Sequence, residues 1–238
     1  MQSVERAFDG RITSGFPRSR VALSSRLPDR LSWKDAFLFP IGTPEGRRDV
    51  LIGGLAIIFL LPVGWMLNLG ARLDVVQRLY QNDKPFFRGF RPWRRTLARG
   101  CVSAATIFCY LLPSLALAMF ALVGYRDQWR RSVVAMAVVA ALAAFVLGVF
   151  TLPGCMTVYA CEGDPSVLRR PLQAFRRAFE HRHLYFKAWR ISLSAVALSF
   201  LGLLALGIGF IFASVWSWEV VGYAFTVAMY GNLERKSL

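Results

Sequence analysis

Long stretches without a charged residue dominate the second half of this 238-residue chain. Residues 100–125, 132–161 and 191–218 contain no Asp, Glu, Lys or Arg, and a further such stretch follows Glu219 and runs to Gly231. A bilayer core of ~30 Å needs ~20 apolar residues in one helix, and a soluble domain has no use for so many in succession. The sequence therefore predicts an all-α integral membrane protein.

Four transmembrane helices fit these stretches. The first two cover about 97–123 and 132–159, and two tight spans share 191–231, with a turn somewhere between Gly207 and Trp218. Such a turn places Glu219 beside Trp216 and Trp218 at the membrane interface. The alternative is that Glu219 is a polar residue inside the membrane with a function. Asn68, in the apolar segment 49–71, is a second candidate of the same kind.

The segment 49–71 either spans the membrane or turns back at Pro62 as a re-entrant helical hairpin. If it spans, the Lys and Arg residues outside the membrane divide 12 to 17 between the two faces; if it turns back, they divide 26 to 3. The positive-inside rule favours the second arrangement strongly. The sequence therefore predicts an N-terminal re-entrant hairpin that packs against the helical bundle, because irregular backbone at membrane depth needs protein around it.

The charge pattern also predicts the organisation and location of the chain. Residues 1–48 form a basic N-terminal arm without a sustained apolar period, followed by a helical membrane domain over 49–238. Within the arm, only Leu31 to Phe39 has the aromatic residues to lie along a membrane or a partner. We expect the protein in the cytoplasmic (inner) membrane of a bacterium, with both termini in the cytoplasm.

Two amphipathic surface helices are predicted, over about 72–81 and 171–182, where apolar residues share one side and arginines the other. Between the first of them and the first span, arginines alternate with aromatic residues. In a soluble protein this pattern suggests single-stranded nucleic acid; beside a bilayer it indicates an aromatic belt with arginines at anionic headgroups, which we favour. The residues predicted to contact the membrane surface or a partner are Arg72, Arg78, Arg88, Arg91, Trp93, Arg94, Arg95, Arg176 and Arg177.

A small-residue seam lies in the second span. Ala140, Ala144 and Gly148 recur every four residues, which lets a neighbouring helix approach closely. Packing within the same chain is the expected use of this seam, and pairing with a second copy is the alternative.

The sequence offers no catalytic or metal-binding constellation. His181 and His183 point in different directions on a helix and have no acidic residues at metal-ligand spacing, and the four cysteines form no CxxC pair. No phosphate-binding glycine loop or nucleophile elbow is present. We therefore expect a protein that is not an enzyme and has no cofactor, while a bound lipid or pigment stays open.

The chain resembles a family of bacterial and archaeal membrane proteins known as domain of unknown function 4013, over about residues 31–231. The resemblance implies a fold and no reaction. The chain departs from it near Trp93, where such proteins look acidic and this one has arginines. The matching marks, in order, are Leu51-Ile52-Gly53-Gly54, Pro62-Val63-Gly64, Gly70, Pro85, Trp93, Leu97, Gly100, Leu112-Pro113, Leu152-Pro153, Tyr159-Ala160, Glu162-Gly163 and Ala174-Phe175.

The function expected from the sequence is that of an accessory or scaffolding subunit in a larger membrane protein complex, with anionic lipids and other membrane subunits as partners and no nucleic acid. Two alternatives remain. Broken helices at membrane depth are also typical of a small-solute or lipid transporter or channel. A hairpin and two surface helices would equally suit a membrane-surface organiser that senses curvature.

Overall fold

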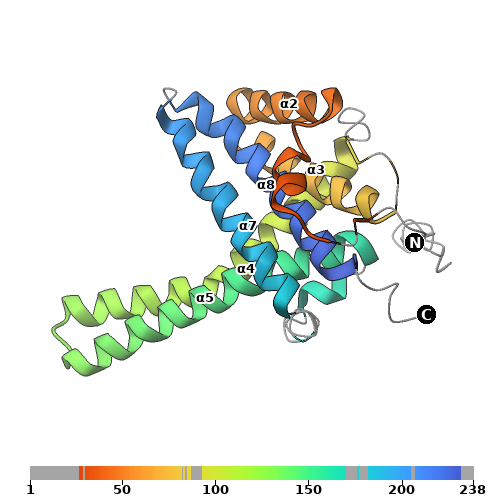
Figure 1. Cartoon of the computed structure of the whole chain (residues 1–238). Helices are drawn as coiled ribbons and strands as arrows, with labels where there is room; N and C mark the ends of the chain where they lie inside the picture. The colour runs from red at the N-terminus through yellow and green to blue at the C-terminus, as the bar shows by residue number, and fades with distance from the viewer. Residues whose placement is uncertain are drawn as a thin grey trace, which may run out of the picture.

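The computed structural model describes residues 27–28, 30–81, 83, 85–86, 93–163, 165–169, 176, 182–204 and 207–231, and every element within them is helical (Figure 1). Two short 3-10 helices, η2 and η3, follow α5 and α7. The elements are α1 (Trp33–Leu38), α2 (Pro44–Leu60), α3 (Val63–Tyr80), α4 (Trp93–Arg126), α5 (Arg131–Glu162), η2 (Pro165–Arg169), α7 (Arg182–Phe200), η3 (Leu201–Leu204) and α8 (Ile208–Tyr230).

Three helical hairpins make up the molecule: α2 with α3, α4 with α5, and α7 with α8. Their turns all lie toward the left of Figure 1, and α2, α4 and α8 have their opposite ends toward the right. Among the described residues, four helices are long and apolar enough to cross a membrane, namely α4, α5, α7 with η3, and α8. This confirms the predicted helical class and the four candidate spans.

The first hairpin forms where the sequence places a break. Helix α2 begins at Pro44, whose preceding residue Thr43 accepts a hydrogen bond from the backbone N–H of Gly46 at 3.1 Å, and it ends just before Pro62. Gly64 then lies so close to the Ala56 carbonyl that a Cβ there would be 1.9 Å from the oxygen. The helix–turn–helix is therefore present, while its re-entry into a membrane stays a prediction.

Helices α3 and α4 cross in backbone contact at a pair of glycines. A Cβ on Gly70 would be 1.9 Å from the Thr96 carbonyl oxygen, and one on Gly100 would be 1.8 Å from that of Met66. Beside the crossing, Asp74 pairs with Arg99 and accepts a hydrogen bond from Thr96 Oγ1 at 3.0 Å. Because no side chain separates the two backbones, this contact fixes the first hairpin against the second.

The body of the molecule, which we define as α1–α3, α7, α8 and the C-terminal half of α5, has its core around α7 and α8. Tyr185, Ile191, Val220 and Phe225 are fully buried there. The Tyr185 hydroxyl donates a 2.6 Å hydrogen bond to the carbonyl of Phe150, which ties α7 to α5.

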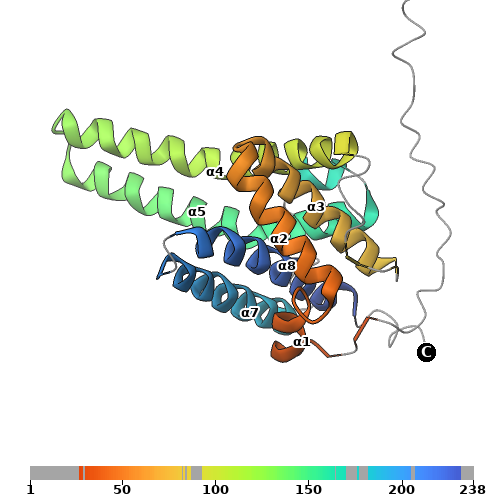
Figure 2. The same ribbon diagram turned by 90° about the horizontal axis from the view of Figure 1, so that it is seen from above.

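The second hairpin extends well beyond this body (Figure 2). We call its distal part, residues 108–147, the α4–α5 arm. Its side chains are mostly apolar and exposed, and Ser114 Oγ donates a 3.0 Å hydrogen bond to the Ala141 carbonyl between the two helices. The arm therefore holds together through contacts between its own two helices.

Several sequence expectations differ from the structure in position. Residues 33–38 form α1, which packs against α8: Trp216 Nε1 donates a 3.2 Å hydrogen bond to the Phe37 carbonyl. The boundary at residue 48 falls inside α2, and the predicted surface helix over 72–81 is the second half of α3. The two-domain division itself stays a prediction, and the predicted helix over 171–182 lies almost entirely outside the described residues.

The turn between α7 and α8 lies at the N-terminal end of the predicted range, Gly207 to Trp218. Helix α8 begins at Ile208 directly after Gly207, whose φ of 78° suits glycine and few other residues. Glu219 consequently lies in the middle of α8 and is buried, rather than in an interfacial turn beside Trp216 and Trp218. The expectation of a turn beside Glu219 is wrong for this reason, and the depth of Glu219 in a membrane stays a prediction.

Candidate functional site

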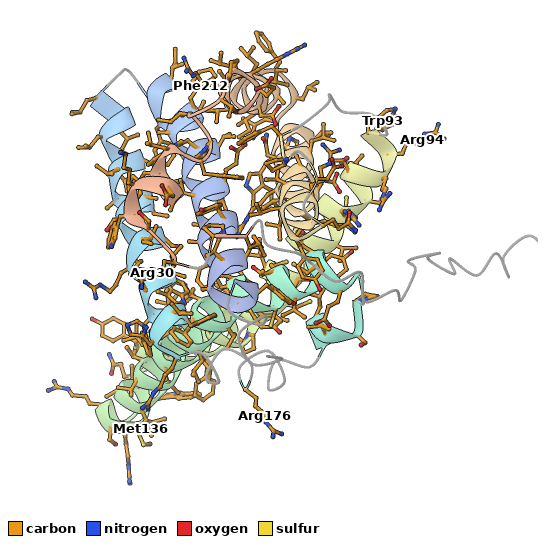
Figure 3. All side chains as sticks on the ribbon, turned by 45° about the vertical axis from the view of Figure 1, so that its right-hand side comes forward. Arg30, Trp93, Arg94, Met136, Arg176 and Phe212 are labelled. Atoms are coloured by element: carbon orange, nitrogen blue, oxygen red, sulfur yellow. The ribbon has the colours of Figure 1, made fainter. Side chains whose placement is uncertain are left out.

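A pocket of about 320 Å³ lies between α2, α3 and α8, and we call it the α2–α3–α8 pocket. Figure 3 shows Phe212 of α8 reaching toward α2 at this side of the molecule, where its ring lies against Gly54. The walls are mostly apolar, with five polar or charged side chains among them. The lining residues are Asp49, Ile52, Gly53, Ile57, Trp65, Asn68, Leu69, Ala71, Arg72, Val75, Phe210, Ile211, Ser214, Val215, Trp218 and Glu219.

Two carboxylates from distant parts of the chain line this pocket. Asp49 on α2 and Glu219 on α8 are each only 8% exposed. Oε2 of Glu219 is buried and has no hydrogen-bond partner among the described residues. A buried carboxyl oxygen without a hydrogen-bond partner is unfavourable, so this position in the pocket is suited to receive one.

Arg72 brings a positive charge to the same pocket. Its guanidinium lies 4.9 Å from the ring centre of Trp218, in cation–π geometry. Burial lowers the pKa of Arg72 to about 10, so the side chain stays protonated at neutral pH. Arg72 therefore lines the α2–α3–α8 pocket and is half-buried, while its predicted contact with the membrane surface or a partner stays a prediction.

Asn68 holds the first hairpin closed at the edge of the pocket. Its amide nitrogen donates to the carbonyl of Gly53 on α2 at 2.9 Å and to that of Gly64 on its own helix at 2.8 Å. The orientation of the amide follows from these two acceptors. Asn68 and Glu219, the two polar residues singled out within apolar segments, thus line one pocket.

Polarity changes along the length of the pocket. Asp49, Arg72 and Glu219 lie away from the hairpin turns, whereas Ile57, Trp65 and Phe210 lie within a few residues of them. Because α2 and α3 run in opposite directions from their turn at Pro62, these two groups occupy opposite ends. The pocket therefore suits a molecule with one polar end and one apolar end.

The remaining residues predicted to contact the membrane surface are described only in part. Trp93, Arg94 and Arg95 are exposed at the start of α4, where Figure 3 shows Trp93 and Arg94 pointing outward, and Arg176 is exposed as well. Arg78 donates a 3.2 Å hydrogen bond to the Phe86 carbonyl. Their contact with headgroups or a partner stays a prediction, and Arg88, Arg91 and Arg177 lie outside the described residues.

The small-residue seam of α5 divides into an inner and an outer part. Gly148 is buried, and a Cβ there would lie 2.9 Å from the Tyr110 carbonyl oxygen of α4. Ala144 is half-buried and Ala140 is exposed, whereas Ala137 and Ala141 face α4. Part of the seam thus serves the chain's own packing, and Ala140 leaves a shallow outer surface.

Sequence reasoning missed Asp49 and the Asp74–Arg99 pair. Asp49 was taken as the boundary of an apolar segment, and its position opposite Glu219 depends on how α2 and α8 cross. Among the described residues, no group of three or more His, Cys, Asp or Glu side chains is placed to hold a metal ion.

Comparison of the chain with protein-family models, curated proteins and solved structures gives no match. The resemblance to domain of unknown function 4013 therefore stays a prediction.

Proposed function

We propose that this chain is a non-enzymatic accessory or scaffolding subunit of a larger membrane complex, and that the α4–α5 arm is its contact surface. The supporting observation is that, among the described residues, only a small fraction of α4 and α5 is buried. The most apolar windows of α4 and α5 are 11% and 17% buried, against 50% for α8. Two long apolar helices thus extend from a packed body, and the described residues leave most of their outer faces uncovered.

The small outer surface of α5 favours a protein neighbour on this arm. Without a large side chain at Ala140, a partner helix can approach the backbone closely, and such contact is what drives helix association in a bilayer. Lipid tails gain less from a small-residue surface, because they do not offer the rigid complementary backbone.

The test is recovery of the intact chain from its native membranes in mild detergent, for the natural sequence and for Ala140→Trp. We expect a second membrane protein in defined proportion, lost in Ala140→Trp. Val196→Trp, on the exposed face of α7, is the matched control and should keep the partner. Recovery of this chain alone at every ionic strength, or an unchanged complex with Ala140→Trp, would contradict the proposal.

A second candidate function is transport of a small solute or lipid. It is favoured by the α2–α3–α8 pocket, where Asp49, Arg72 and Glu219 lie beside a hairpin that ends in a proline turn. Flux across reconstituted vesicles that disappears in Glu219→Gln would support this function over the accessory role. Vesicles with no flux for cationic, neutral or anionic solutes would remove it.

A further inference from the structure

Another pocket, of about 500 Å³, lies where α1 meets the first half of α7, and we call it the α1–α7 pocket. Figure 2 shows the two helices beside each other there. Among the described residues, its lining consists of basic and aromatic side chains only. The lining residues are Trp33 of α1 and Arg182, His183, Phe186, Lys187 and Arg190 of α7.

The spacing along α7 gathers the basic side chains on one side of the helix. His183, Lys187 and Arg190 follow each other at intervals of four and three residues, and Arg182 precedes Phe186 by four. Like charges at such intervals destabilise a helix. Within the described part of the chain, none of the four basic side chains forms an ion pair with a carboxylate. An anion in the pocket would therefore meet several N–H donors and relieve the repulsion between them.

The two aromatic side chains of the pocket are held by packing on other helices. Trp33 stacks on Phe37 with ring centres 6.0 Å apart, and Phe37 packs edge-on against Trp216 of α8 at 5.4 Å. The ring of Phe186 lies 5.6 Å from that of Phe150 on α5. The aromatic part of the pocket is therefore preorganised, which lowers the cost of binding.

The position of the pocket along α7 suits the headgroup level of a bilayer. Arg190 is followed by a stretch without a charged residue that continues through η3, so the pocket lies at the entry of this candidate span. Tryptophan rings and the long side chains of Arg and Lys are typical of that level. A volume of about 500 Å³ holds roughly 16 non-hydrogen atoms, taking ~30 Å³ for an atom of water size. This is about the size of a phosphoglycerol headgroup with its glycerol backbone.

We propose that the α1–α7 pocket binds the headgroup of an anionic phospholipid, with the phosphate between Arg182, Lys187 and Arg190. The glycerol backbone lies against Trp33 and Phe186, and the acyl chains continue along the apolar part of α7. Nucleic acid offers the same phosphate chemistry, but the charge-free stretch that follows on α7 favours a lipid. The proposal is independent of the accessory role, which rests on the α4–α5 arm.

The test uses the full chain in maltoside detergent and titration calorimetry with dihexanoyl phosphatidylglycerol, with the detergent alone as blank. Dihexanoyl phosphatidylcholine is the matched probe, because it has the same phosphate and acyl chains and no net charge. We expect saturable binding of phosphatidylglycerol, at least tenfold tighter than that of phosphatidylcholine. Equal affinities for the two lipids would overturn the proposal.

Two pairs of substitutions and one single variant locate the site. Lys187→Gln with Arg190→Gln should weaken phosphatidylglycerol binding at least tenfold. Arg94→Gln with Arg95→Gln removes the same charge from the exposed start of α4 and should change the affinity less than twofold. An equal loss in the two pairs would show that binding follows net charge and would overturn the site. Arg182→Gln, at an exposed position, should weaken binding at least threefold and keeps the site testable if the first pair does not fold. Unchanged binding in Arg182→Gln would overturn the site as well.

Two soluble competitors decide the source of the phosphate. Glycerophosphoglycerol has the headgroup without acyl chains, so we expect it to bind at least tenfold more weakly than the lipid. A single-stranded oligonucleotide should not displace phosphatidylglycerol. If either competitor binds as tightly as the lipid, the assignment to a phospholipid is wrong.

Discussion

The α4–α5 arm and the body both contain long apolar helices and differ in what surrounds them. In the body, α8 contacts α2, α3, α5 and α7, and Val220 is completely buried. In the distal part of the arm, most of the described side chains are exposed, and Val139 is 66% exposed. Apolar character therefore shows that a helix belongs in a membrane, and the small residues and polar groups along it determine where it packs.

The largest effect should come from the glycine crossing that joins the two regions. Gly100→Leu forces a side chain into the Met66 carbonyl, so we expect a loss of at least about 3 kcal/mol of stability, or no folded protein. Thermal unfolding in detergent, followed by circular dichroism, measures this. Ala98→Leu, two residues earlier on an exposed position of α4, is the control and should leave the midpoint nearly unchanged. Equal unfolding midpoints for the two variants would show that the backbone contact between α3 and α4 does not contribute to stability.

The polar group beside that crossing should have the next largest effect. Asp74→Ala removes the carboxylate from Arg99 and the acceptor from Thr96, both of them largely buried, and should cost about 2 kcal/mol. The same measurement applies. Asp127→Ala, exposed at the turn of the arm, should change the stability by less than about 0.5 kcal/mol. A loss of stability in Asp127→Ala as large as in Asp74→Ala would contradict the conclusion that Asp74 stabilises the crossing of α3 and α4.

Sequence and structure agree where the determining property is local. Pro62 removes a backbone donor and coincides with the break between α2 and α3, although Pro113 and Pro153 lie inside α4 and α5. A charge-free stretch of sufficient length predicts a span without knowledge of its neighbours. These features gave the hairpin turn and all four long helices. The turn before α8 was less certain, because glycines and tryptophans over 207–218 offered several positions for it.

The pocket could not be predicted, because it depends on contacts between distant residues. Asp49 and Glu219 are separated by 170 positions and line one pocket because Gly53 and Gly54 let α8 lie close to α2. A single sequence shows the glycines without their partners. Arg72 shows the same limit: its cation–π contact with Trp218 of α8 depends on how the two helices pack, which the sequence alone does not show.

The same substitution in the two regions gives a direct comparison. Val220→Ala creates a cavity in the packed body and should cost about 1 to 2 kcal/mol. Val139→Ala in the α4–α5 arm removes a side chain that only solvent or lipid surrounds in this chain, so we expect less than about 0.5 kcal/mol. Both midpoints are measured in the same detergent. If Val139→Ala lowers the stability as much as Val220→Ala does when both are measured in native membranes, a partner covers the arm there. In detergent, the difference between the two variants should then return.

The smallest effect concerns the hydrogen bond that links the body to the base of the second hairpin. Tyr185→Phe removes the donor to the Phe150 carbonyl and keeps the ring, which also packs edge-on against Phe225. Hydrogen bonds between membrane helices contribute little on average, so we expect about 1 kcal/mol. Tyr125→Phe, which is exposed near the turn of the arm, is the matched control and should have no effect. Because Tyr185 contacts α5 on one side and α8 on the other, a loss well above that value would mean that α5, α7 and α8 unfold as one unit. A loss near zero would mean that the ring contacts alone hold α7 against α5.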